Sequence, residues 1–156
     1  MRESSDRPDI LVLPPVLVGS VLLIGLAVHY FLWTVEPLPV TLARPLGLTL
    51  FIASGLLAHL AHRAFQRVGT NVLPTKPTLA IATDGPYRHT RNPLYLAALG
   101  VYLGVALWVD SAILLLLVPM VAVGLHRGVV LPEERYLERK FGSAYTQYRA
   151  RVRRWL

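Results

Sequence analysis

Two adjacent carboxylates, Glu133 and Glu134, stand at the end of the last long apolar run of this chain. Ionisable groups at the edge of a lipid bilayer are costly to hold there, so such groups are candidates for function. Because neighbouring side chains on a helix point about 100° apart, one carboxylate can face a site while the other faces a partner or water. The first would bind a cationic group such as an ammonium or a sulfonium. A simpler interpretation stays open, in which both are first-turn acids after Pro132 that stabilise a helix N-terminus.

The second candidate is the basic segment GPYRHTRNPLY, which precedes an apolar hairpin. Pro93 suits the first position of a helix and Asn92 suits its N-cap, so the segment predicts a helix start. An arginine beside a helix N-terminus, here Arg91, can bind a carboxylate or phosphate, or can serve as a positive anchor at the membrane surface. Tyr87 and Tyr95 would form aromatic walls for an adenine or a cation, or belong to an interfacial aromatic belt.

The other polar side chains do not predict a metal site. His59 and His62 are three residues apart, but no acidic partner accompanies them in the pattern of known zinc or di-metal sites. The chain contains no cysteine, which excludes a disulfide framework, a thiolate metal site and a cysteine nucleophile. We therefore expect no bound metal.

The elements that position these residues are predicted to be membrane helices. Apolar residues make up 54% of the 156 positions, only 16% are charged, and the mean hydropathy is +0.48. The net charge is +7, but the basic residues flank apolar runs, as the positive-inside rule describes, and do not form a nucleic-acid-binding module. The composition thus predicts an all-α integral membrane protein with membrane lipids, and no nucleic acid, as partners.

Four apolar segments are expected to form about four transmembrane helices, because each is near the ~20 residues that cross a bilayer. Asp110 or Ser111 would cap the last of them, and Gly100 with Gly104 predicts a close contact between helices. The first segment is too long for a cleaved signal peptide, so we expect it to be retained. The segments span residues 10–33, 45–64, 93–109 and 111–125.

The distribution of charge predicts the orientation. Basic residues outnumber acidic ones in the 64–92 loop and from Arg127 to the end of the chain, which places both in the cytoplasm. Four spans then place the N-terminus there as well, although the charge of the N-terminal tail does not itself favour this side. After Pro132, apolar and aromatic side chains recur at steps of three and four residues with basic residues between them. This pattern predicts a C-terminal amphipathic cytoplasmic helix.

The order of these segments along the chain resembles the order found in a known protein family. GPYRHTRNPLY, then a hairpin, then EERYLERKFGSAYTQYRARVRRW is similar to the small bacterial relatives of isoprenylcysteine carboxyl methyltransferase, whose superfamily includes the membrane phospholipid methyltransferases. The resemblance covers residues 67–156, including GTNVLPTKPT. It implies one domain in the bacterial cytoplasmic membrane, with a two-helix part at 10–66 and a cofactor-binding catalytic part at 67–156. The implied cofactor is S-adenosyl-L-methionine, held at the cytoplasmic face without a Rossmann domain.

The resemblance also implies site residues. The family's R-H/N-P-x-Y segment falls on Arg91, Asn92, Pro93 and Tyr95, and its E-E-x-x-L segment falls on Glu133, Glu134 and Leu137. Its F-G-x-x-Y-x-x-Y segment falls on Phe141, Gly142, Tyr145 and Tyr148. Catalytic roles would belong to Arg91, Glu133 and Glu134. Cofactor binding would involve Tyr87, Arg91, Asn92, Pro93, Tyr95, Glu133, Glu134, Leu137, Tyr145 and Tyr148.

The methyl acceptor is expected to be a lipophilic small molecule from the bilayer, either an isoprenoid-linked carboxylate or a phospholipid or other amine. A carboxylate needs no general base, whereas an amine must be neutral, and Glu133 or Glu134 would accept its proton. Two other classes stay open: an NADPH-dependent sterol-reductase-like enzyme, and a non-enzymatic scaffold whose basic tail binds anionic lipid. The sequence leaves the oligomeric state undetermined.

Overall fold

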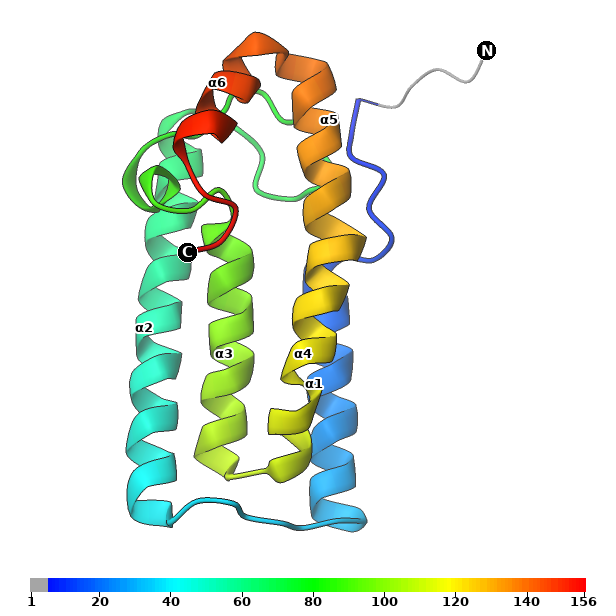
Figure 1. Ribbon diagram of the computed structural model, residues 1–156, viewed down its shortest axis with the longest axis vertical. Coiled ribbons are helices and arrows are strands. Elements are labelled where there is room, and N and C mark those ends of the chain that lie inside the picture. Colours follow the sequence, from blue (N-terminus) through cyan, green and yellow to red (C-terminus); the bar gives the residue numbers. More distant parts are fainter. Residues whose placement is uncertain (1–5) are drawn as a thin grey trace.

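The computed structural model describes residues 6–156 as an elongated bundle of helices with an additional layer over one end (Figure 1). Within these residues the chain forms no β-strand, and a single parallel bridge joins Thr90 to Arg153. The prediction of an all-α fold is confirmed. In chain order the elements are α1 Pro14–Phe31, α2 Val40–Arg67, the 3-10 turn η1 Gly85–Arg88, α3 Pro93–Val109, α4 Ala112–Leu125, the π-helical turn η2 His126–Val130, α5 Leu131–Phe141 and α6 Ser143–Arg151.

In the described part of the chain, three helices are long and apolar enough to cross a membrane: α1, α2 and the continuous helix Ala112–Phe141. Large apolar side chains, such as Leu23, Ile52 and Leu56, are exposed on α1 and α2, as expected for surfaces in contact with lipid. The chain is therefore a membrane protein. The remaining predicted span, residues 93–109, is α3, whose 17 residues have the predicted bounds, but the count of four spans stays a prediction.

Helices α2 and α3 pack closely because glycines line their contact. A Cβ atom on Gly104 would lie 2.9 Å from the backbone nitrogen of Phe51, and one on Gly47 would collide with the backbone of Trp108. A Cβ atom on Gly100 would collide with the Ser54 hydroxyl. The predicted close helix contact at Gly100 and Gly104 is confirmed. The prediction that α2 begins at Pro45 is wrong, because α2 begins at Val40 and includes Pro45.

The tight hairpin between α3 and α4 is held by two polar residues. Asp110 ends α3 in the left-handed conformation with φ 55°, and its carboxylate accepts a hydrogen bond from the Leu38 backbone at 3.2 Å. Ser111 caps α4 by accepting a hydrogen bond from the Leu114 backbone nitrogen at 3.4 Å, which confirms the predicted cap. Asp110 thereby also fastens the connection between α1 and α2 to this end of the bundle.

The helix that begins at Ala112 continues past Pro132 through the π-helical turn. Proline lacks an N–H group, so Pro132 leaves the carbonyl of Gly128 without its α-helical donor. The backbone N–H of Leu11 donates to that oxygen at 2.9 Å. Since the first turn of α5 continues an existing helix, its N–H groups do not form a free, positively polarised terminus for Glu133 and Glu134.

The segment after Pro132, expected to form one amphipathic helix, is divided between α5 and α6. Gly142 separates them with φ 53° and ψ −124°, a conformation that glycine adopts readily and other residues avoid. The chain then becomes extended at Val152, so that Trp155 lies beyond the helix. As a result α6 folds back over the end of the bundle and the C-terminus lies near the start of α3 (Figure 1).

We expect Gly47→Ala to destabilise the protein by about 1–3 kcal/mol, because the added methyl group collides with the backbone of α3. The matched control is Gly55→Ala in the same helix, where a Cβ atom meets nothing within 4 Å. That variant should be neutral or more stable, since alanine favours helices over glycine by about 1 kcal/mol. Thermal unfolding in detergent, followed by circular dichroism, measures both. Equal losses in the two variants would contradict the close packing.

Candidate functional site

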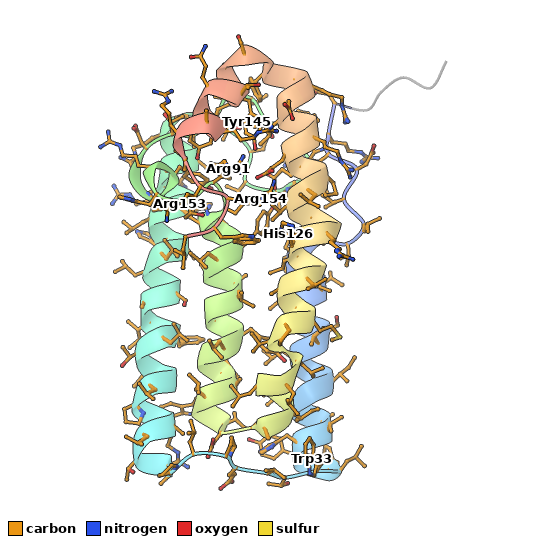
Figure 2. All side chains as sticks on the ribbon, viewed as in Figure 1. Trp33, Arg91, His126, Tyr145, Arg153 and Arg154 are labelled. Atoms are coloured by element: carbon orange, nitrogen blue, oxygen red, sulfur yellow. The ribbon has the colours of Figure 1, made fainter. Side chains whose placement is uncertain are left out.

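A buried cluster of opposite charges lies where three parts of the chain meet: α5, the start of α3, and residues 152–156, which we call the C-terminal tail. The Glu134 carboxylate accepts hydrogen bonds from Arg154 Nε at 3.1 Å and from Arg154 Nη2 at 2.9 Å, the latter to Oε2. Arg91 Nη2 lies 3.4 Å from Oε1 of the same carboxylate. The side chains of Glu134 and Arg91 are only 7% and 9% exposed. Hydrogen bonding to Glu134 raises the pKa of Arg154 above its ordinary value. Figure 2 shows Arg91 and Arg154 beneath α6.

The C-terminal tail is fastened to the segment that leads into α3. The Arg91 backbone nitrogen donates to the Arg153 carbonyl at 2.9 Å, and the Thr90 hydroxyl donates to the Arg154 carbonyl at 3.1 Å. The Asn92 side-chain amide donates to the same Arg154 oxygen at 2.9 Å. Asn92 occupies the predicted N-cap position, but its side chain does not cap α3, because it bonds the tail. These bonds bring Arg154 to Glu134.

Glu133 points to a different place from Glu134. Its carboxylate accepts a hydrogen bond from the Tyr95 hydroxyl at 2.7 Å, and its side chain lines a cavity of about 510 Å³ between α1, α2 and α3. Neighbouring positions on a helix diverge by about 100°, which is why one glutamate joins the charged cluster and the other faces the cavity. Tyr95, near the start of α3, holds the Glu133 carboxylate in place.

The cavity has a polar end and an apolar remainder. Phe65 and Tyr87 stack beside it with ring centroids 5.0 Å apart. Burial and, to a lesser extent, the nearby charge of Glu133 raise the pKa of Tyr87 well above its ordinary value, so its phenol is neutral at physiological pH. Polar groups reach the cavity from Arg91, Asn92, Tyr95 and Glu133. Its apolar lining includes Leu13, Pro14, Pro15, Val18, Ala58, Val72, Leu73, Ala98 and Val101.

Arg91 has donor capacity that the described residues do not use. Its Nε and Nη1 atoms are buried and lack a hydrogen-bond partner among residues 6–156, while Nη2 is paired with Glu134. A buried donor without a partner costs about 1–3 kcal/mol. Because Arg91 lines the cavity, these N–H groups can bind an anionic oxygen there.

The structure brings half of the predicted site residues to the cavity. Tyr87, Arg91, Asn92, Tyr95 and Glu133 line it, and Glu134 holds Arg91 from outside it. Besides Glu134, the predicted residues that do not line this cavity are Pro93, Leu137, Tyr145 and Tyr148. The assignment of cofactor-binding and catalytic roles stays a prediction.

The two C-terminal tyrosines pack behind the cavity. The Tyr148 hydroxyl donates to the carbonyl of Tyr87 at 2.8 Å, and so supports an aromatic wall. Tyr145 is 1% exposed. Burial, together with the negative charge of Glu134, raises the pKa of Tyr145 above its ordinary value, so this phenol is neutral at physiological pH.

Sequence reasoning missed several residues of this site. Arg154 is one of several arginines near the end of the chain, and no local pattern distinguishes it from the others. Phe65 lies at the end of an apolar helix, and its stacking on Tyr87 depends on the fold. The start of α1 also borders the cavity, although the sequence places it far from the basic segment.

These features define a class of protein: a helical membrane protein with a charged cluster beside an amphipathic cavity. A family model described as phospholipid methyltransferase matches residues 42–144, which is more than half of the chain. The chain belongs to the phospholipid methyltransferase family, a family of methyltransferases, and the predicted family is confirmed. The match includes Arg91, Glu133 and Glu134 and ends before Tyr145.

The chain is also similar in sequence to a shorter bacterial protein. An uncharacterized protein of Haemophilus influenzae is 36% identical over 63 residues, which is 40% of this chain and the full length of the relative. No solved structure matches the chain.

We expect Glu134→Gln to destabilise the protein by about 3–5 kcal/mol, because it leaves two arginines without their shared counter-charge at a buried position. The matched control is Glu138→Gln, four residues along α5. Glu138 pairs with Arg149 at the surface, where both side chains are more than 40% exposed. Its loss should cost no more than about 1 kcal/mol. Chemical unfolding in detergent compares the two, and equal effects would contradict the importance of the buried cluster.

Proposed function

We propose that the protein is an S-adenosylmethionine-dependent methyltransferase whose acceptor is a lipophilic molecule from the bilayer. The observation that carries the proposal is the position of Arg91 and Glu133 on one cavity, the first with unused buried donors and the second with a carboxylate facing inward. Membership of a methyltransferase family supports methyl transfer over a nicotinamide-dependent reduction or a scaffold role.

The residues of the cavity match the chemical groups of the cofactor, which when bound supplies an activated methyl group. Nε and Nη1 of Arg91 would hold its carboxylate, and Glu133 would hold its ammonium or sulfonium. The stacked rings of Phe65 and Tyr87 would hold its adenine. The volume of about 510 Å³ lies in the range of small-molecule sites. In this proposal Glu133 faces the cofactor, and Glu134 positions Arg91.

The apolar part of the cavity would receive the acceptor. Val18 on α1, Ala58 on α2 and Val101 on α3 line it below the polar end, at the level of the apolar helices. Methyl transfer to a carboxylate or amine is an in-line displacement, so the protein needs mainly to orient the reactants and exclude water. For an amine acceptor, Glu133 can take up the proton, while Tyr95 keeps its carboxylate in position.

The distribution of basic residues supports a position in the membrane and an orientation across it. Arg67 ends α2, Arg88 ends η1 and Arg135 lies in α5. The end of α2 and helix α5 lie at the same end of the bundle (Figure 1). By the positive-inside rule this end, the site and both termini would lie in the cytoplasm, with α3 as a short fourth span in a bacterial cytoplasmic membrane. The chain would act as one domain, in which α1 and α2 complete a cavity built mainly on residues 67–156.

Calorimetric titration of the detergent-purified protein with S-adenosylhomocysteine tests the cofactor. We expect binding by the parent protein and a loss of about 10- to 100-fold in Arg91→Ala, since a hydrogen bond to a charged group contributes about 1.5–3 kcal/mol. Glu133→Gln should also weaken binding. Arg88→Ala is the control, because Arg88 pairs with Asp84 at the surface with 72% of its side chain exposed. The absence of binding by the parent protein would exclude the proposed cofactor.

Transfer of a labelled methyl group tests the acceptor. Membranes that contain the protein, incubated with methyl-labelled S-adenosylmethionine, should accumulate label in the lipid extract, whereas membranes with Arg91→Ala should not. Treatment with alkali then distinguishes the two acceptor classes, because a methyl ester releases labelled methanol and an N-methyl group keeps its label. Label found only in water-soluble products would contradict a lipophilic acceptor.

A further inference from the structure

Tyr136 joins three separate parts of the chain through one hydroxyl group. This residue of α5 is 4% exposed. Its oxygen accepts hydrogen bonds from the Thr78 backbone nitrogen at 3.1 Å and from Lys140 Nζ at 3.2 Å, and it donates to Asp6 Oδ1 at 2.9 Å. A phenol has one donor and two acceptor sites, so this arrangement uses all of them.

Two of these parts border the cavity. The N-terminal segment, residues 6–13, runs beside α5 into α1, and Leu13 and Pro14 line the cavity. The loop at residues 68–84 crosses from α2 toward α5, and its Leu73 and Pro74 line the cavity as well (Figure 1). Because the N-terminal segment and the loop are far apart in sequence, their common attachment is a feature of the tertiary structure.

Both parts also have bonds that do not involve Tyr136. In the loop, the Thr70 hydroxyl accepts from the Leu79 backbone at 2.9 Å, and the Asn71 amide donates to the Pro77 carbonyl at 2.8 Å. The N-terminal segment has a second attachment to α5, because Asp6 pairs with Lys140 of that helix at 2.7 Å. The loop is thus a compact unit with its own hydrogen bonds, and Thr78 attaches it to α5.

We propose that Tyr136 is a positioning residue that holds the N-terminal segment and the loop together over the cavity. The proposal rests on the proposed function, because its consequence is control of water access and ligand release at that cavity. Tyr136 is not among the residues that line the cavity, so removing its hydroxyl leaves Arg91 and Glu133 unchanged. The N-terminal segment and the loop should loosen together when that group is lost, since one oxygen serves both.

Hydrogen exchange on the full-length protein in detergent tests the proposal with Tyr136→Phe. The informative amides are Leu11, bonded to the Gly128 carbonyl, and Leu79, bonded to the Thr70 hydroxyl, because neither touches Tyr136 directly. We expect both to exchange about fivefold faster or more, the factor for one typical hydrogen bond. S-adenosylhomocysteine should also dissociate several-fold faster.

Two further variants separate positioning from general stability. Tyr102→Phe removes another buried hydroxyl, which donates to the Leu114 carbonyl at 3.1 Å in the core, and should not accelerate exchange selectively at the cavity. Thr78→Pro removes the loop's N–H donor, and also fixes φ at that position, without touching the bonds of Asp6, so it should release the loop while Leu11 stays protected.

Unchanged exchange at Leu11 and Leu79 in Tyr136→Phe would overturn the proposal, as would equal acceleration in Tyr102→Phe. The exchange measurement needs no ligand. If the parent protein fails to bind S-adenosylhomocysteine while both amides respond, the proposed cofactor is wrong and the junction at Tyr136 stands. If it binds and neither amide responds, the junction is wrong.

Discussion

The structure of the polar end depends on one buried carboxylate. Glu134 is held between Arg91 and Arg154, and a charge at such a position is tolerable only when its partners are in place. Each partner comes from a different part of the chain, so the ion pairs join α5, the segment before α3 and the C-terminal tail. The need of the buried Glu134 carboxylate for partners explains why α6 and the tail fold back over the bundle. There Thr90 and Asn92 bind the tail's backbone.

The direction of the two glutamates follows from the continuity of their helix. Pro132 would ordinarily end a helix, but the π-helical turn before it and the donor supplied by Leu11 allow the helix to pass. Glu134 then faces the arginines, and Glu133 faces Tyr95 and the cavity. The N-terminal segment therefore contributes to the site by satisfying a carbonyl as well as by lining the cavity.

The cavity lies at the boundary between the charged end and the apolar bundle, and this placement suits a membrane methyltransferase. Its polar end can bind a charged ligand, while its apolar lining continues along α1 and α3. The close contact of α2 and α3 at Gly47 and Gly104 holds together two helices that line the cavity elsewhere along their length. A reaction that depends on orientation and exclusion of water needs such elements in a fixed arrangement.

The sequence by itself determined the helical membrane class, the bounds of α3, a helix cap at Asp110 or Ser111 and the family, because hydropathy, proline position and short motifs are local properties. It did not distinguish Arg154 among the arginines of the tail, or reveal that the Asn92 side chain binds the tail. Nor did it reveal that the helix continues across Pro132. Only the tertiary structure decided these, because a buried charge or an unpaired carbonyl takes whichever partner the packing brings near, and that choice leaves no pattern in neighbouring residues.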